Sequence, residues 1–213
     1  MATRRNSSDV MQRILDAATD VFASQGLAGA RMDEIAARAG VSKALIYYHV
    51  PDKESLYASV MSATLAQARG ALLEATGRST DPEERFRLAI GAIAGLAETF
   101  PHFGPLMLRE IATGGAGLPD EIVAEMRRVF GVIGEILGAG VAAGTFRPTD
   151  PVVAHMLIAG GVLVLSAGAP IRRRVRGESG GRDEGAVPDV VASLLLDGIR
   201  LPAARRARAK KTK

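Results

Sequence analysis

The sequence predicts an all-α protein, and three observations support this fold class. Apolar residues recur at the three- and four-residue intervals of a helix over most of the 213 residues. No segment alternates apolar and polar positions as a half-buried strand does. Capping residues and helix breakers divide the apolar runs into three short helices, a long fourth helix and a larger group of helices beyond residue 80.

The composition limits the classes of protein to which the chain can belong. The absence of cysteine excludes disulfides and thiolate metal sites and suits the reducing cytoplasm, where we expect the protein to act. The first nine residues contain two arginines but no apolar run, so no secretory signal is expected. A hydrophobic content of 47% is ample for a buried core.

The positive net charge of the chain comes from its last residues. Seven of the 27 lysines and arginines fall in residues 200–213, which contain no acid, so residues 1–199 hold 20 basic and 23 acidic side chains. We interpret residues 201–213 as a disordered basic tail. The alternative is a non-specific contact to DNA or to a membrane surface.

The first helices follow from clear start and stop signals. After a disordered arm predicted over residues 1–9, Asp9 and Gln12 form a capping-box pattern that begins the first helix, and Gly26 ends it. A second short helix is predicted over residues 32–39, because Gly40 follows it and its apolar positions lie on one face.

The third and fourth helices are separated by a proline. Ser42 is a good N-cap for a third helix that reaches His49, since Pro51 prevents its continuation. Asp52 then caps a long fourth helix with one apolar face.

The loop TGRSTDP at residues 76–82 is the best boundary within the chain, and further helices follow it. Glycine and proline clusters separate these helices from one another, and a loop is expected over residues 169–186. The predicted helices cover about residues 83–99, 103–113, 119–143, 151–168 and 187–200.

Residues 32–49 have the pattern of a helix-turn-helix, in which the second helix enters the major groove of DNA. If Ile46 and Val50 form the buried face of the third helix, its outward face consists of Lys43, Ala44, Tyr47 and Tyr48. Tyrosine hydroxyls there can reach phosphates or base edges, and the simpler alternative is that the tyrosines cover a neighbouring helix.

Lys53 lies in the first turn of the fourth helix, where a cation is disfavoured unless a phosphate binds. The simpler interpretation is that Lys53 forms a surface ion pair with Glu54.

Residues 10–57 resemble the DNA-binding domain of the tetracycline-repressor (TetR) family of bacterial transcription regulators. The resemblance rests on the ordered motifs ILDAATDVFASQG, IAARAGVSKALIYYHV and DKESLY. These motifs cover roughly a quarter of the chain. The remainder resembles the family in architecture and length. The implied organisation is a helix-turn-helix DNA-binding domain at residues 10–57 and a ligand-binding and dimerisation domain at residues 58–200.

The resemblance also implies a role for individual residues. Tyr47, His49 and Lys53 would contact backbone phosphates. Arg31 stands where the family often has a capping threonine; it cannot cap the helix, but its guanidinium can reach a phosphate. Val50 stands where many members have phenylalanine and fills the same core position with less volume. Leu45 either packs on a thymine methyl group or belongs to the edge of the core. The residues at or near the groove would be Ser42, Lys43, Ala44, Leu45 and Tyr48.

For the C-terminal part, the resemblance implies a small effector held inside the helical bundle and a homodimer formed through the last two helices, about 151–168 and 187–200. Effector binding would move the fourth helix. Mostly apolar residues with a few polar points are the candidates to line the cavity. No charge cluster indicates an ionic effector, so we expect an apolar or weakly polar molecule. The candidates are Phe100, His102, Phe103, Met107, Met126, Phe130, His155 and Met156.

Two other classes of function are disfavoured. Residues 138–143, GAGVAA, match a dinucleotide-binding pattern but follow a predicted helix rather than a strand, which favours close helix packing over an oxidoreductase site. Residues 151–171 are long and uncharged enough for a membrane span, yet contain His155, Ser166 and several glycines and prolines, which favours a buried helix at a subunit interface. The three histidines lack metal-ligand spacing, so no metal, cofactor or enzymatic activity is expected.

The sequence therefore predicts a homodimeric cytoplasmic regulator that binds a palindromic operator in double-stranded DNA. We expect a repressor that an unknown small-molecule effector releases from the operator. The alternative is a DNA-binding structural protein without an effector, which uses its basic tail for sequence-independent binding.

Overall fold

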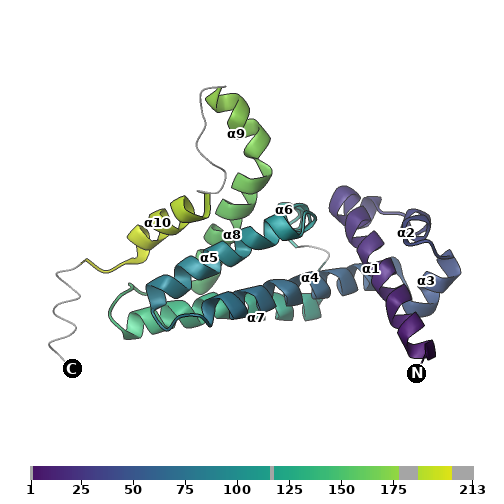
Figure 1. The fold of residues 1–213 in the computed structure, drawn as a ribbon, viewed down its shortest axis with the longest axis horizontal. Coiled ribbons are helices and arrows are strands. Elements are labelled where there is room, and N and C mark those ends of the chain that lie inside the picture. The colour runs from purple at the N-terminus through teal and green to yellow at the C-terminus, as the bar shows by residue number, and fades with distance from the viewer. Residues whose placement is uncertain (1, 116–117, 178–186, 203–213) are drawn as a thin grey trace. The chain divides into compact units, whose positions relative to one another are not determined.

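The computed structural model describes residues 2–115, 118–177 and 187–202. These residues form helices joined by short turns, and the predicted all-α class is confirmed (Figure 1). Within the described ranges, the pairing of Phe146 with Arg200 is an isolated bridge outside any strand. The helices are α1 (Ala2–Gly29), α2 (Met32–Ala39), α3 (Lys43–His49), α4 (Lys53–Thr76), α5 (Pro82–Thr99), α6 (Phe103–Ala112), α7 (Asp120–Ala142), α8 (Pro151–Ala167), α9 (Ala169–Arg176) and α10 (Val187–Ile199).

The helices separate into two compact units. The first unit contains the chain up to Ala66 together with Pro101–Ala124, and the second contains Gln67–Phe100 and the described residues from Glu125 onward. The first unit extends nine residues beyond the boundary expected after residue 57, and its last residue, Ala66, lies within α4. The segment 101–124, expected in the C-terminal domain, joins the first unit because α6 packs on α1.

The first helix differs from the expectation at its start and agrees with it at its end. Residues 2–9, predicted as a disordered arm, are helical in the structure, since they contain neither glycine nor proline to interrupt α1. Gly26 has φ 72° and ψ 175°, so the regular helix stops there as predicted.

The turn between α2 and α3 is formed by the residues that the sequence indicates. Gly40 has a left-handed backbone conformation, with φ 64° and ψ 39°. The N–H of Val41, the next residue, donates to the carbonyl oxygen of Ala36. The Ser42 hydroxyl oxygen accepts the N–H of Leu45 at 3.2 Å and caps α3. The bounds of α2 and α3 are those predicted from the sequence.

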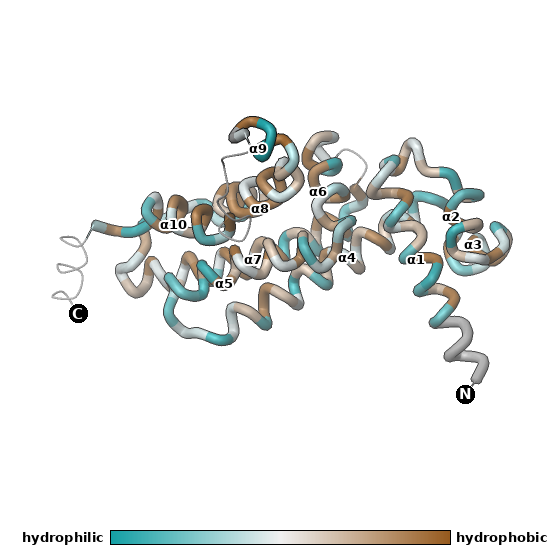
Figure 2. The backbone as a smooth tube through the Cα atoms, turned by 45° about the horizontal axis from the view of Figure 1, so that its top comes forward, coloured by the Kyte–Doolittle hydropathy of each residue, from teal (hydrophilic) through white to brown (hydrophobic). Residues whose placement is uncertain are grey.

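The core of the second unit is formed where α5, α8 and α10 pack against one another. The helix α8 is apolar along most of its length (Figure 2). Phe146 is fully buried, with its ring centroid 6.1 Å from that of Phe86. Residues 169–176, predicted as part of a loop, form α9, because Gly168 ends α8 and Pro170 is tolerated in the first turn of the next helix. The rest of that predicted loop, residues 178–186, lies outside the described residues, as does most of the predicted basic tail.

Candidate nucleic-acid interface

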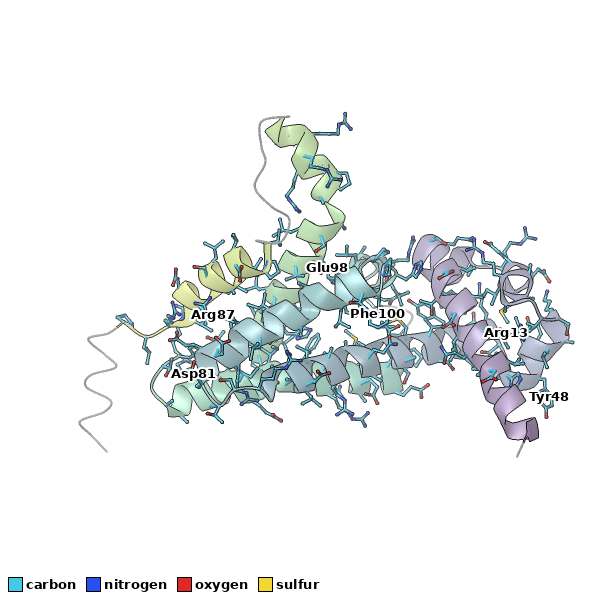
Figure 3. The ribbon with its side chains drawn as sticks, in the orientation of Figure 1. Arg13, Tyr48, Asp81, Arg87, Glu98 and Phe100 are labelled. Carbon is cyan, nitrogen blue, oxygen red and sulfur yellow. The ribbon has the colours of Figure 1, made fainter. Side chains whose placement is uncertain are left out.

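The α3 helix is anchored on one side and exposed on the other, as the sequence predicts. Ile46 is fully buried and Val50 is 5% exposed, so these two side chains hold the helix in the first unit. Tyr47 is 44% exposed and Tyr48 is 82% exposed. Figure 3 labels Tyr48 among the side chains of the first unit. Lys43 and Ala44 also lie on the exposed face. Large aromatic side chains that remain in solvent on one face of a short helix form a surface suited to a partner.

The remaining predicted residues of α3 are less exposed. Leu45 and His49 are half-buried, and the His49 ring lies edge-on to that of Tyr48, with centroids 5.3 Å apart. The Ser42 hydroxyl already caps the helix through its oxygen, although its O–H remains able to donate a hydrogen bond.

The cations beside α3 are held by contacts that the sequence did not indicate. Lys43 forms an ion pair with Asp33 on α2, with Nζ 3.0 Å from Oδ1. Lys53 donates from Nζ to the carbonyl oxygen of Ala30 at 3.3 Å. The alternative reading paired Lys53 with Glu54, whereas the structure shows a contact of Lys53 with the backbone. Arg31 occupies the N-cap position of α2 without a side-chain hydrogen bond to the helix, as expected for a residue that cannot cap.

Tyr57 is the one tyrosine that does not face solvent. It is 1% exposed, its ring packs edge-on against Phe22 with centroids 4.9 Å apart, and its hydroxyl donates to the Glu110 carboxylate. Burial, and secondarily Glu110, raises the pKa of Tyr57 above its usual value. The sequence placed this residue in packing, but nothing in the pattern indicated a partner 53 residues away.

Two further polar contacts join α6 to α1 in the first unit. His102 Nε2 lies 2.9 Å from Asp20 Oδ1, and Arg109 donates from Nη2 to the carbonyl oxygen of Ser24 at 3.0 Å. Together with the Tyr57–Glu110 bond, these contacts attach α6 to α1 and α4 within the first unit.

The eight residues proposed to line an effector cavity are divided between the two units. His102, Phe103 and Met107 belong to the first unit, and the other five belong to the second. Met156 is 40% exposed on α8. In the second unit the rings of Phe130 and His155 stack with centroids 4.0 Å apart.

His155 is the buried polar residue of this group. The side chain is 7% exposed, and Nδ1 has no hydrogen-bond partner among the described residues. Burial lowers the pKa of His155 to about 4, so the imidazole is neutral near pH 7.

A surface groove of about 570 Å³ lies in the second unit, between the C-terminal half of α4, the helix α5 and Asp189 of α10. Phe100 lines it and is the one predicted cavity residue that does so. Arg87 and Phe100 lie toward opposite ends of α5 (Figure 3). Gly91 and Gly95 leave open space on the floor, since an added Cβ at either position would meet no atom within 4 Å. Sequence reasoning missed this groove, because it favoured bulky apolar residues over small ones.

The α8 and α10 helices, which pack on each other, share an exposed apolar surface. Exposed apolar side chains of this size mark a candidate interaction surface. We call this set the α8–α10 face; its members, each at least 40% exposed, are Val152, Val153, Met156, Leu157, Val164, Val190 and Leu194.

The structure also bears on the two disfavoured functions. The GAGVAA segment lies at the end of α7, and Gly140 packs directly against Phe146, as a close-packing role predicts. Among the described residues, no single helix is long and apolar enough to cross a membrane. The pair Pro151–Ala167 and Ala169–Val175 meets the criteria of length and composition only when joined, and it is bent by 66°.

Comparison with known proteins identifies the relatives of the chain. A model of bacterial regulatory proteins of the tetR family matches residues 14–60, and a model of the tetracyclin repressor-like C-terminal domain matches residues 79–165. The chain is 30% identical over 138 residues to the HTH-type transcriptional regulator RutR of Escherichia coli K12, a match that covers 65% of each chain. It is also 30% identical over 136 residues to the HTH-type transcriptional repressor NicS of Pseudomonas putida, covering 63% of this chain and 64% of NicS. The matched part thus spans just under two thirds of the length of these relatives.

Solved structures share the fold over nearly the whole chain. A TetR family transcription regulator from Marinobacter aquaeolei VT8 superimposes with a TM-score of 0.76 at 20% identity, covering 95% of this chain and all of that one. FadR from Bacillus subtilis, solved in complex with stearoyl-CoA, has a TM-score of 0.72 at 22% identity and covers 88% of this chain and 98% of its own.

Proposed function

Because the chain belongs to the tetR family of bacterial regulatory proteins, we propose that it is a DNA-binding transcription regulator and that α3 is its recognition helix. The observation that supports this role best is the orientation of α3. Ile46 is buried, whereas Tyr47 and Tyr48 remain in solvent beside Lys43. A helix held in this way can enter the major groove while its outward side chains contact base edges and phosphates.

The proposed contacts divide into two kinds. Residues at the start of α3 and on its outward face are placed to meet bases in the groove, namely Ser42, Lys43, Ala44, Leu45 and Tyr48. Tyr47, His49, Arg31 and Lys53 surround them and would contact phosphates. Lys53 would exchange its neutral acceptor, the Ala30 carbonyl, for a charged phosphate, and the N-terminus of α4 would favour the same anion.

The proposed binding is tested by selecting sites from random DNA and measuring affinity for the recovered sequence. Tyr47→Ala and Lys53→Ala should each weaken binding at least several-fold, because a proposed phosphate contact is lost in each variant. Arg147→Ala, an exposed cation of the second unit, is the control for charge and should bind like wild type. If both α3-side variants bound like the control, α3 would not be the recognition helix. Deleting residues 203–213 distinguishes the alternative function, in which nearly all binding depends on the tail.

We propose that the regulator is a homodimer formed through the α8–α10 face. Its exposed apolar side chains would be buried against the same face of a second copy, as a two-fold interface requires. Two recognition helices would then read a palindromic operator, with half-sites about 34–36 Å apart or a multiple of this distance. Leu194→Asp places a charge on a residue that is 69% exposed, so it should yield a folded monomer in analytical ultracentrifugation. A variant that stayed dimeric would exclude this face.

We further propose that a small molecule binds in the second unit and releases the protein from DNA. We also propose that the protein acts in the cytoplasm and has no enzymatic activity. Two features support a ligand there: the groove beside Phe100 and the unbonded Nδ1 of the buried His155. Apolar and weakly polar compounds, with acyl-CoA molecules included because FadR binds one, can be screened by thermal shift. Gly91→Leu should abolish a stabilising shift if the ligand occupies the groove, and His155→Leu should do so if the ligand contacts the imidazole. A compound whose shift survives both substitutions would bind elsewhere.

A further inference from the structure

Asp33, near the start of α2, faces the first residue of α3. Its carboxylate oxygens Oδ1 and Oδ2 lie 3.0 and 3.1 Å from Lys43 Nζ, so one ammonium group contacts both oxygens. The side chains of Asp33 and Lys43 are 67% and 46% exposed, so a partner can reach the pair, which lies at the start of the proposed recognition helix. No sequence motif indicated this residue, because the contact joins two helices across the turn.

The other lysine beside α3 is held differently. Lys53 Nζ donates to the carbonyl oxygen of Ala30, an uncharged acceptor, and so keeps its full positive charge. Lys43, in contrast, is neutralised by a carboxylate at contact distance. The two lysines of this surface therefore differ in how strongly they attract a phosphate before any base is read.

We propose that Asp33 is a positioning residue that determines specificity: it neutralises Lys43 until a DNA acceptor takes the place of the carboxylate. The proposal rests on the DNA-binding function proposed above. On an arbitrary duplex, a neutralised lysine releases no counterions, and the carboxylate repels nearby phosphates. On the operator, the ammonium can instead donate to a base edge such as guanine O6 or N7. An exposed ion pair is weak enough to be exchanged for such a contact.

Asp33 also has a purely structural role against which the proposal must be tested. It is an acid in the first turn of α2, where it stabilises the helix dipole, as does its neighbour Glu34. That stabilisation does not depend on Lys43. The proposed role, in contrast, disappears when Lys43 is absent.

The test is a double-mutant cycle measured on DNA. Wild type, Asp33→Asn, Lys43→Gln and the double variant are titrated with the selected operator and with an unrelated duplex of equal length over a range of salt concentrations. Asp33→Asn should make the salt slope on unrelated DNA steeper by about 0.9 per protomer, which corresponds to roughly fivefold tighter binding per protomer at 0.15 M salt. Operator affinity should rise less, so the ratio between operator and unrelated DNA should fall several-fold. In the Lys43→Gln background, Asp33→Asn should change neither quantity.

Three further variants serve as controls. Glu54→Gln removes an equal charge from an exposed position in the first turn of α4 and should leave the specificity ratio near that of wild type. Lys53→Gln should be additive with Asp33→Asn, because Asp33 does not contact Lys53. Asp33→Glu retains a carboxylate and should restore the wild-type ratio.

The outcomes separate the inference from the function on which it rests. A wild-type protein that binds no DNA would refute the proposed function. If the wild-type protein binds its operator, two results would refute the role of Asp33 alone. One is a ratio between operator and unrelated-DNA affinity that Asp33→Asn leaves unchanged. The other is a change in this ratio that is equally large when Lys43→Gln is also present. Thermal midpoints of the same variants report the structural role independently.

Discussion

Replacing Gly140 by alanine would place a methyl group inside the volume occupied by the Phe146 ring. A Cβ built at this position lies 2.0 Å from Cδ2 of Phe146 and 2.6 Å from Cγ and Cε2. The ring has little room to move, because Phe146 is fully buried and contacts Phe86. Its backbone is also fixed, since the neighbouring Arg147 N–H donates to the carbonyl of Ile199 at 2.8 Å.

Two effects of opposite sign decide the result. Alanine in place of glycine inside a helix stabilises it by about 1 kcal/mol. Forcing a methyl group into a filled core costs about 1–3 kcal/mol, and more when a buried aromatic ring must be displaced. We expect Gly140→Ala to lower the free energy of unfolding by about 2 kcal/mol.

Gly138 provides a matched control on the same helix. It is exposed, and an added Cβ would meet no atom within 4 Å, so Gly138→Ala should raise the free energy of unfolding by about 0.5–1 kcal/mol. Urea denaturation followed by far-ultraviolet circular dichroism measures both variants. Phe146→Leu should lower the free energy of unfolding less in the Gly140→Ala variant than in wild type, because the smaller side chain relieves the clash. If Gly140→Ala stabilised the protein as much as Gly138→Ala, the inference that α7 packs closely against Phe146 at Gly140 would be refuted.

Two further predictions concern buried polar side chains. The pKa of His155 is about 4 in the folded protein against 6.5 in the unfolded chain, so the unfolded state binds more protons between these values. The free energy of unfolding should therefore fall by up to about 3 kcal/mol as the pH is lowered from 6.5 to 4, and His155→Leu should flatten this dependence in urea titrations. Tyr57→Phe keeps the ring contact with Phe22 but leaves Glu110 without its donor, so the thermal midpoint should fall by the equivalent of about 1–2 kcal/mol. An unchanged midpoint would show that this hydrogen bond does not contribute.

The sequence predicted the helices best where a single residue determines the backbone. The bounds of α2 and α3 follow from Gly40, whose φ of 64° ends one helix, and from the Ser42 cap and Pro51, which limit the next. The burial of Ile46 followed from helical periodicity once those bounds were known. Residues 169–176 were missed because a glycine and a proline indicate a break, although proline is accepted in a first helical turn.

The candidate sites were predictable only in part, because side-chain partners depend on packing between distant segments. The exposed face of α3 could be derived from a 100° rotation per residue, but the pairing of Lys43 with Asp33 depends on how α2 and α3 cross. The eight cavity candidates were chosen for size and polarity, and the structure divides them between two units. Small residues such as Gly91, which form the groove, give no signal in a search for apolar side chains.

The packing of α6 on α1 has a consequence for the design of chimaeras between this chain and related proteins. The unit that supports α3 is not one continuous stretch of chain, because it includes Pro101–Ala124. A chimaera joined after Ala66 would retain Tyr57 and Asp20 but take their partners, Glu110 and His102, from a foreign chain. The unit of exchange is therefore two segments, and a graft that transfers only the first would leave a buried tyrosine hydroxyl without its acceptor.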